Sequence, residues 1–161
     1  QQTRPQTLSY GLNDSPVGLL AWVVEKFREW SDCGGDVESV FTKDELLTNV
    51  MLYWVTSSIG SSMRLYYESQ GVMPGTGSEM NDLLRVKSTV RIAVAQFPRD
   101  IDHAPRAWCE AAFNLQRYTL FARGGHFAAM EQPAPLVCDV RAFFLHDLAL
   151  GSHGRGGTSA L

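Results

Sequence analysis

Cysteine is scarce in this 161-residue sequence, and charge of either sign is never concentrated. The three cysteines, Cys33, Cys109 and Cys138, are far apart, without the close spacing of a zinc site or the density of a disulfide framework. We therefore expect reduced thiols, no bound metal and a cytoplasmic protein. The net charge is -3 and there is no acidic or basic block, so we expect no nucleic-acid partner.

Long hydrophobic runs are also absent. No apolar stretch approaches the ~20 residues that cross a bilayer, and residues 1–5 lack the charged and then apolar pattern of a signal peptide. Hydrophobic residues make up 45% of the chain and charged residues 19%, which is an ordinary balance for a globular domain. We expect a soluble chain with no membrane segment of its own.

The first part of the chain has helical periodicity. Ser15 can cap a helix over 16–30, where Pro16 suits the first position and apolar residues recur at helical spacing. Thr42 and Glu45 have the spacing of a capping box at the start of a second, long helix. We expect residues 59–62 to bend or divide that helix.

After a loop at 71–77 that contains glycine and proline, the pattern changes to alternating strands and helices. Strands are predicted over 90–95 and 118–122, and helices over 105–113 and 133–144. This order and these lengths indicate a parallel strand–helix–strand unit, in which ligands bind beyond the carboxyl ends of the strands. The residues of the last helix expected to face inward are Leu136, Val140, Phe143 and Phe144.

Polar side chains follow each of the two predicted strands. Asp100 comes soon after the first, and His126 stands on a Gly-Gly turn after the second. An imidazole acts as a general base near neutral pH when a carboxylate fixes its tautomer. The alternative is that the histidine only satisfies local backbone groups and the aspartate only caps a helix, and Asp102 competes for both of its roles. His103 is expected on the solvated surface.

Two adjacent tyrosines, Tyr66 and Tyr67, lie near the end of the long helical region. From the pattern alone they are predicted to be core or interface aromatics.

Four stretches together carry a resemblance to a known family. They are Thr-Arg-Pro-Gln-Thr at 3–7, Leu-Asn-Asp-Ser-Pro-Val-Gly-Leu at 12–19, Leu-Leu-Thr-Asn-Val-Met-Leu-Tyr-Trp at 46–54 and Gly-Gly-His-Phe-Ala-Ala at 124–129. In this order they resemble the microsomal-type epoxide hydrolases of the α/β-hydrolase superfamily, over roughly residues 1–145.

The resemblance implies an α/β fold in which part of a helical lid precedes the last parallel strands and helices of the core sheet. Residues 1–70 would then belong to the lid, 71–85 to a linker and 86–147 to the α/β-hydrolase core. We expect residues 148–161, with their glycine-rich and serine-containing end, to form a disordered tail.

The resemblance also implies a two-step covalent mechanism. In that family an aspartate attacks an oxirane carbon to form an ester, and two lid tyrosines donate hydrogen bonds to the oxirane oxygen. A histidine paired with an acid then activates the water that cleaves the ester. By motif, His126 resembles the general base and Asp100 the acid, with Asp102 as the alternative; related enzymes often have glutamate there. Tyr66 resembles one lid tyrosine, with Tyr67 as the alternative.

The same resemblance implies a small apolar epoxide and water as substrates, no cofactor, and a homodimer as one form of the full-length protein. The family's nucleophile elbow and its His-Gly-x-Pro segment do not occur in this sequence. We therefore expect the C-terminal half of an epoxide hydrolase, inactive alone. One alternative is another α/β-hydrolase, such as a haloalkane dehalogenase or an esterase. The other is a non-catalytic relative that binds an apolar ligand.

Overall fold

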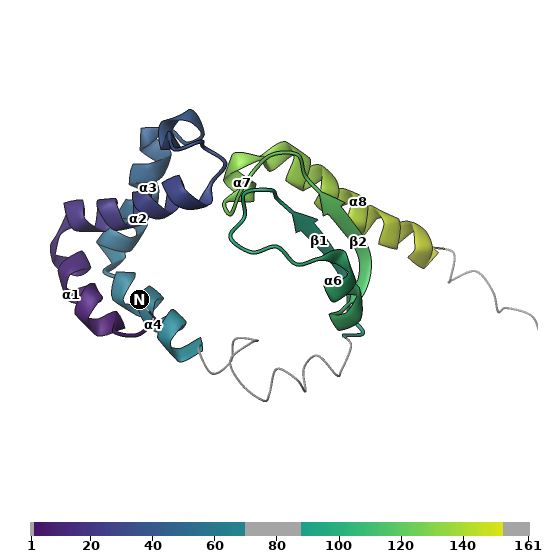
Figure 1. The fold of residues 1–161 in the computed structure, drawn as a ribbon, viewed down its shortest axis with the longest axis horizontal. Coiled ribbons are helices and arrows are strands. Elements are labelled where there is room, and N and C mark those ends of the chain that lie inside the picture. Colours follow the sequence, from purple (N-terminus) through teal and green to yellow (C-terminus); the bar gives the residue numbers. More distant parts are fainter. Residues whose placement is uncertain (1, 70–87, 153–161) are drawn as a thin grey trace, which may run out of the picture. The chain divides into compact units, whose positions relative to one another are not determined.

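The computed structural model describes residues 2–69 and 88–152 (Figure 1). The chain divides into two compact units, Gln1–Lys87 and Ser88–Leu161. The linker predicted at 71–85 lies outside the described residues. In the described ranges, none of the helices has both the length and the apolar character that a membrane span requires.

The described part of the first unit is helical. Its elements are α1 (Pro5–Asp14), α2 (Pro16–Trp30), a 3-10 turn (Val37–Ser39), α3 (Lys43–Thr56) and α4 (Ile59–Glu68). The helix predicted over 16–30 is confirmed as α2, whereas α1 was not predicted as a separate helix.

Side-chain caps explain where two of these helices begin. The Ser15 hydroxyl accepts a hydrogen bond from the Gly18 N–H at 3.0 Å, and Pro16 occupies the first turn of α2. At the start of α3, the Glu45 N–H donates to the Thr42 hydroxyl at 3.2 Å, and the Thr42 N–H donates to the Glu45 carboxylate at 2.8 Å. The predicted capping box is therefore confirmed.

The long helical region divides earlier than predicted. Ser57 takes a left-handed conformation, with φ of +50°, and ends α3, while residues 59–62 are helical within α4. Gly60 has a packing role instead of a bending one, because a Cβ there would lie 3.1 Å from the Ser9 Cβ of α1. The small residue lets α1 and α4 approach closely.

The core of the first unit lies between these helices. Leu19, Phe41 and Met63 are its most completely buried large side chains. Phe41 follows the 3-10 turn and packs edge-on against Phe27 of α2, with ring centroids 5.0 Å apart. This contact holds the turn between α2 and α3 against the helices.

The second unit is built around two parallel strands. Its elements are β1 (Arg91–Gln96), α6 (Arg106–Ala112), β2 (Asn114–Leu120), α7 (Ala128–Glu131) and α8 (Pro133–Ser152). The strands pair in parallel with Val94 opposite Tyr118, so the predicted strand–helix–strand unit is confirmed. β2 begins four residues before the predicted strand because Phe113, directly after α6, is already extended.

The last helix differs from its prediction in length and in its inward face. α8 continues to Ser152, so residues 148–152 are helical and do not belong to a disordered tail; Leu148, Ala149 and Leu150 favour helix, and glycine comes only at the end. Residues 153–161 lie outside the described part.

The inward face of α8 is centred on a buried polar residue. Asp139 accepts hydrogen bonds from Arg117 and Thr119 of β2, each at 2.7 Å. These bonds turn Asp139 toward the sheet, so Val140 and Phe144, expected inside, are exposed. Leu136 and Phe143, on the same helical stripe as the aspartate, are half-buried.

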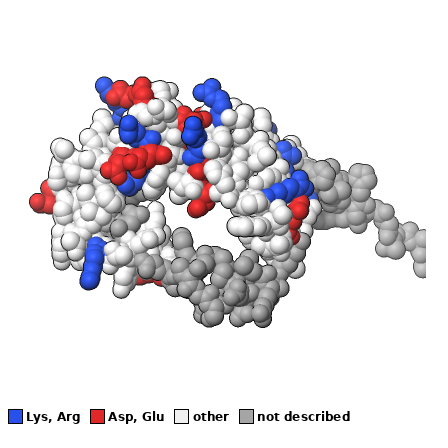
Figure 2. Space-filling view, in the orientation of Figure 1, with Lys and Arg blue, Asp and Glu red and all other residues white. Residues whose placement is uncertain are grey.

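Charged side chains of both signs are interspersed on the face shown in Figure 2. No large patch of one sign occupies the described atoms of that face.

Candidate active site

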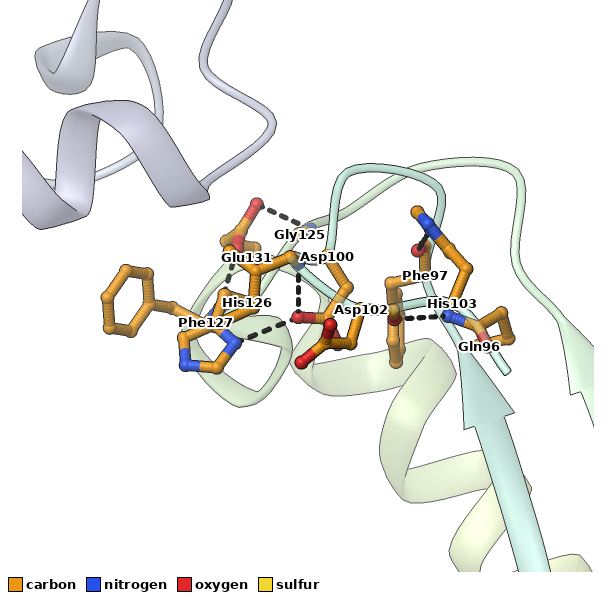
Figure 3. Close-up of polar contacts among 10 residues, drawn as sticks. Gln96, Phe97, Asp100, Asp102, His103, Gly125, His126, Phe127 and Glu131 are labelled. Atoms are coloured by element: carbon orange, nitrogen blue, oxygen red, sulfur yellow. Dashed lines mark hydrogen bonds and ion pairs between the residues drawn. The ribbon is translucent and has the colours of Figure 1, made fainter. Parts of the chain in front are cut away.

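The ends of β1 and β2 lead into two loops that run beside each other (Figure 3). The Phe121 N–H donates to the Gln96 oxygen at 2.9 Å, and the Arg99 N–H donates to the Gly124 oxygen at 3.0 Å. An isolated parallel bridge between Arg99 and Gly125 extends the pairing further. Backbone pairing thus brings the loop that carries Asp100 to the loop that carries His126.

His126 and Asp100 meet at the tip of these loops. The His126 Nδ1 lies 2.8 Å from the Asp100 Oδ1, and the Ile101 N–H donates to the same oxygen at 2.8 Å (Figure 3). The two side chains are 38% and 29% exposed, so water reaches the pair. Because a carboxylate only accepts, Nδ1 is the donor, and Nε2 is the nitrogen that takes up a proton.

The structure distinguishes Asp100 from Asp102. The hydrogen bond to His126 comes from Asp100, whereas Asp102 contributes its backbone oxygen, which accepts from the Gln96 amide at 3.2 Å. A turn sets this difference: the Asp100 N–H donates to the Phe97 oxygen at 3.3 Å and directs its side chain toward the second loop.

Two further side chains brace the Asp100 loop. His103, predicted on the surface, is exposed but donates from Nε2 to the Phe97 oxygen at 2.9 Å. The Gln96 side-chain oxygen accepts from the Ala104 N–H at 3.3 Å. Sequence reasoning gave Gln96 no role, since its bracing depends on the course of the loop.

A layer of aromatic rings and a glycine lie beneath the pair. Phe97 is buried and stacks on Phe121, with centroids 4.3 Å apart. Gly124 has φ of +107°, and a Cβ there would lie 2.8 Å from the Phe97 ring and 2.9 Å from the Gln132 side chain. Only glycine fits at this position on both counts. The first glycine of the Gly-Gly-His turn is therefore a steric requirement of the loop.

The turn that carries His126 is also held by Glu131, a residue that sequence reasoning missed. The Gly125 N–H donates to its Oε2 and the Phe127 N–H to its Oε1, both at 2.9 Å. In a capping box the glutamate stands three residues after the N-cap, whereas Glu131 stands four residues after Phe127, so its spacing in the sequence was not a signal for this role.

The tyrosines lie in the first unit, on the last turns of α4. Tyr66 is 39% exposed and Tyr67 is 53% exposed, so neither side chain lies in the core of this unit. Tyr66 and His126 belong to different units, and the placement of Tyr66 beside the histidine stays a prediction.

The described residues contain no group of three or more histidine, cysteine or acidic side chains arranged to hold a metal ion. The chemistry that this pair offers on its own is proton transfer to and from water.

Comparison with known proteins identifies relatives over most of the chain, although no protein-family model matches it. A putative epoxide hydrolase from Stigmatella aurantiaca is 42% identical over 145 residues, covering 89% of this chain and 31% of that protein. Epoxide hydrolase 1 from Sus scrofa is 43% identical over 152 residues, covering 89% of this chain and 32% of that protein.

A solved structure shares the fold. The juvenile hormone epoxide hydrolase of the silkworm Bombyx mori superposes with a TM-score of 0.81 at 34% identity, covering 93% of this chain and 36% of that chain. The chain thus spans about a third of the length of the proteins it matches. Similarity of this degree in both sequence and fold shows that the chain belongs to the epoxide hydrolase family, with the α/β-hydrolase fold, and matches the C-terminal part of its relatives.

Proposed function

We propose that the full-length protein containing this chain converts epoxides to vicinal diols through a covalent aspartyl ester. This part would supply His126 as the general base, Asp100 as the acid that orients it, and Tyr66 as a proton donor to the epoxide oxygen. One observation carries the proposal: beyond the ends of two parallel strands, the Asp100 carboxylate accepts from the His126 Nδ1 at 2.8 Å.

The pair suits the second, hydrolytic step. With Nδ1 directed to Asp100, the Nε2 of His126 takes a proton from water, and the resulting hydroxide attacks the ester carbonyl. The bond between the acyl carbon and the alcohol oxygen of the ester breaks, and the diol leaves with the proton that the imidazolium returns. Asp100 stabilises the imidazolium while it exists, and such general-base catalysis contributes about 10²–10⁴-fold in rate.

The first step needs a carboxylate nucleophile and a proton donor. The carboxylate oxygen forms a bond to an oxirane carbon as the carbon–oxygen bond of the ring breaks, and negative charge develops on the oxygen that leaves. A phenol placed there stabilises that charge and then protonates it. Tyr66 has an accessible side chain on α4, which supports this role. The elbow that would carry the nucleophile does not occur in this sequence.

The substrate class follows from the family: a small apolar epoxide, with water as co-substrate. A homodimeric full-length protein and a cytoplasmic location remain parts of the proposal that rest on the sequence alone.

Diol formation from styrene oxide tests the proposed function. We expect the full-length protein to form phenylethanediol, and the 161-residue chain alone to form none because it lacks the elbow. Chromatography of the product after incubation with each protein gives the measurement. Diol formation by the chain alone would contradict the proposed division of roles. Halide release from a chloroalkane, or ester cleavage without any diol, would favour another α/β-hydrolase activity.

A further inference from the structure

Glu131 uses both oxygens of its carboxylate on the backbone around His126. Oε2 accepts from the Gly125 N–H and Oε1 from the Phe127 N–H, each at 2.9 Å (Figure 3). These are the amides of the residues directly before and after the histidine. One carboxylate therefore accepts hydrogen bonds from the backbone on both sides of the candidate base.

We propose that Glu131 is a positioning residue for His126 in the hydrolytic step, an inference that rests on the proposed function. Its carboxylate fixes the backbone of the turn, so that the imidazole keeps its Nδ1 on Asp100 whether the ring is neutral or protonated. Glu131 itself acts through the backbone and not on substrate.

The geometry goes beyond an ordinary helix cap. Phe127 precedes α7, and its N–H is one that a side chain of the first turn commonly satisfies. Gly125 lies outside the helix, before the N-cap residue Phe127, so the bond to its N–H is not part of a helix cap. The bond from the Gly125 N–H to Glu131 instead fixes the turn before the helix. A role for Glu131 in capping α7 alone does not explain this bond.

Fixing the backbone on both sides leaves His126 little freedom. The bonds to the Gly125 and Phe127 amides restrict the backbone at His126, and the hydrogen bond to Asp100 restricts its side-chain torsions. The Phe127 ring lies edge-on to the imidazole, with centroids 5.3 Å apart, and limits its rotation further. Reacting groups held in this way gain rate because misplacement by about 1 Å can cost about a hundredfold.

Transient kinetics of Glu131→Gln in the full-length protein test the proposal. Glutamine has the same length but offers one oxygen, so one of the two amides faces an NH₂ group in its place. We expect ester hydrolysis to slow by about 10–100-fold, while ester formation and KM stay unchanged, so that the ester accumulates. Glu110→Gln is the matched control, because Glu110 pairs with Arg106 on the exposed face of α6; its rates should equal those of the wild type.

A second measurement needs no turnover. In protein labelled with ¹⁵N-glycine and ¹⁵N-phenylalanine, the amide resonances of Gly125 and Phe127 should differ between the wild type and Glu131→Gln, and should be the same in the wild type and Glu110→Gln. Ester hydrolysis at the wild-type rate in Glu131→Gln would overturn the proposal, and so would Gly125 and Phe127 resonances that Glu131→Gln leaves unchanged. Failure of the wild type to form an ester would contradict the proposed function, whereas an ester that forms and is cleaved equally fast in Glu131→Gln would contradict the positioning role alone.

Discussion

At the scale of single residues, His126 is held at three places. Its ring is bonded to Asp100, its flanking amides are bonded to Glu131, and Gly124 allows the tight approach of the turn to Phe97. The sequence predicted His126 and Asp100 as candidates because each follows a strand. It left Asp102 open, because a spacing of two residues in a loop cannot show which carboxylate the turn directs toward the histidine.

Replacing Asp100 with asparagine should impair the hydrolytic step selectively. The change keeps the shape of the side chain but removes the negative charge that stabilises the imidazolium, so we expect ester hydrolysis to fall on the order of a hundredfold or more. Single-turnover kinetics of the full-length protein measure this step.

Asp102→Asn is the matched control, because the structure gives Asp102 only a backbone bond within this network. Its rate of ester hydrolysis should stay that of the wild type. A larger loss in Asp102→Asn than in Asp100→Asn would show that the acid is Asp102.

At the scale of elements, the sequence predicted where helices begin better than where they end. The caps at Ser15 and Thr42 could be predicted, since each depends on side chains a few residues apart. The end of α3 at Ser57 could not be predicted, because a serine in the sequence does not indicate the left-handed conformation that Ser57 adopts. The prediction that Val140 and Phe144 face inward was wrong, because the hydrogen bonds from β2 to Asp139 set the rotation of α8 about its axis.

The capping box predicts a pH dependence of stability. Hydrogen bonds from the Thr42 backbone and side chain hold the pKa of the Glu45 carboxyl below its usual 4.5. The unfolded carboxyl therefore binds its proton at higher pH than the folded one. The box then stabilises the fold fully above pH 4.5, and this contribution is lost as the pH falls through the lowered pKa of the folded state.

Thermal unfolding of Glu45→Gln should show this as a smaller fall in Tm between about pH 6 and about pH 3 than the wild type shows. Circular dichroism of the full-length protein gives the measurement. Asp44→Asn is the control, since Asp44 lies in the same first turn but outside the capping box. If Glu45→Gln and the wild type lost Tm equally over this range, the capping account would be wrong.

At the scale of the molecule, the chain consists of a helical unit and a strand–helix–strand unit. Periodicity alone predicted this order, but the α/β-hydrolase fold required the resemblance, because two strands fit many parallel sheets. Both units expose apolar faces, at Leu47, Met51 and Val55 of α3 and at Val137 and Phe144 of α8. Faces of this kind are typical of surfaces that pack against further protein.

The intact mass of His126→Gln in the full-length protein, incubated with styrene oxide, tests whether this chain supplies the water-activating base. Without the imidazole the ester forms but is not cleaved, so we predict a species heavier than the free protein by the mass of the epoxide, accumulating in proportion to enzyme. The wild type should return to its unmodified mass once the epoxide is consumed. Undiminished diol formation by His126→Gln, with no added mass, would contradict the account.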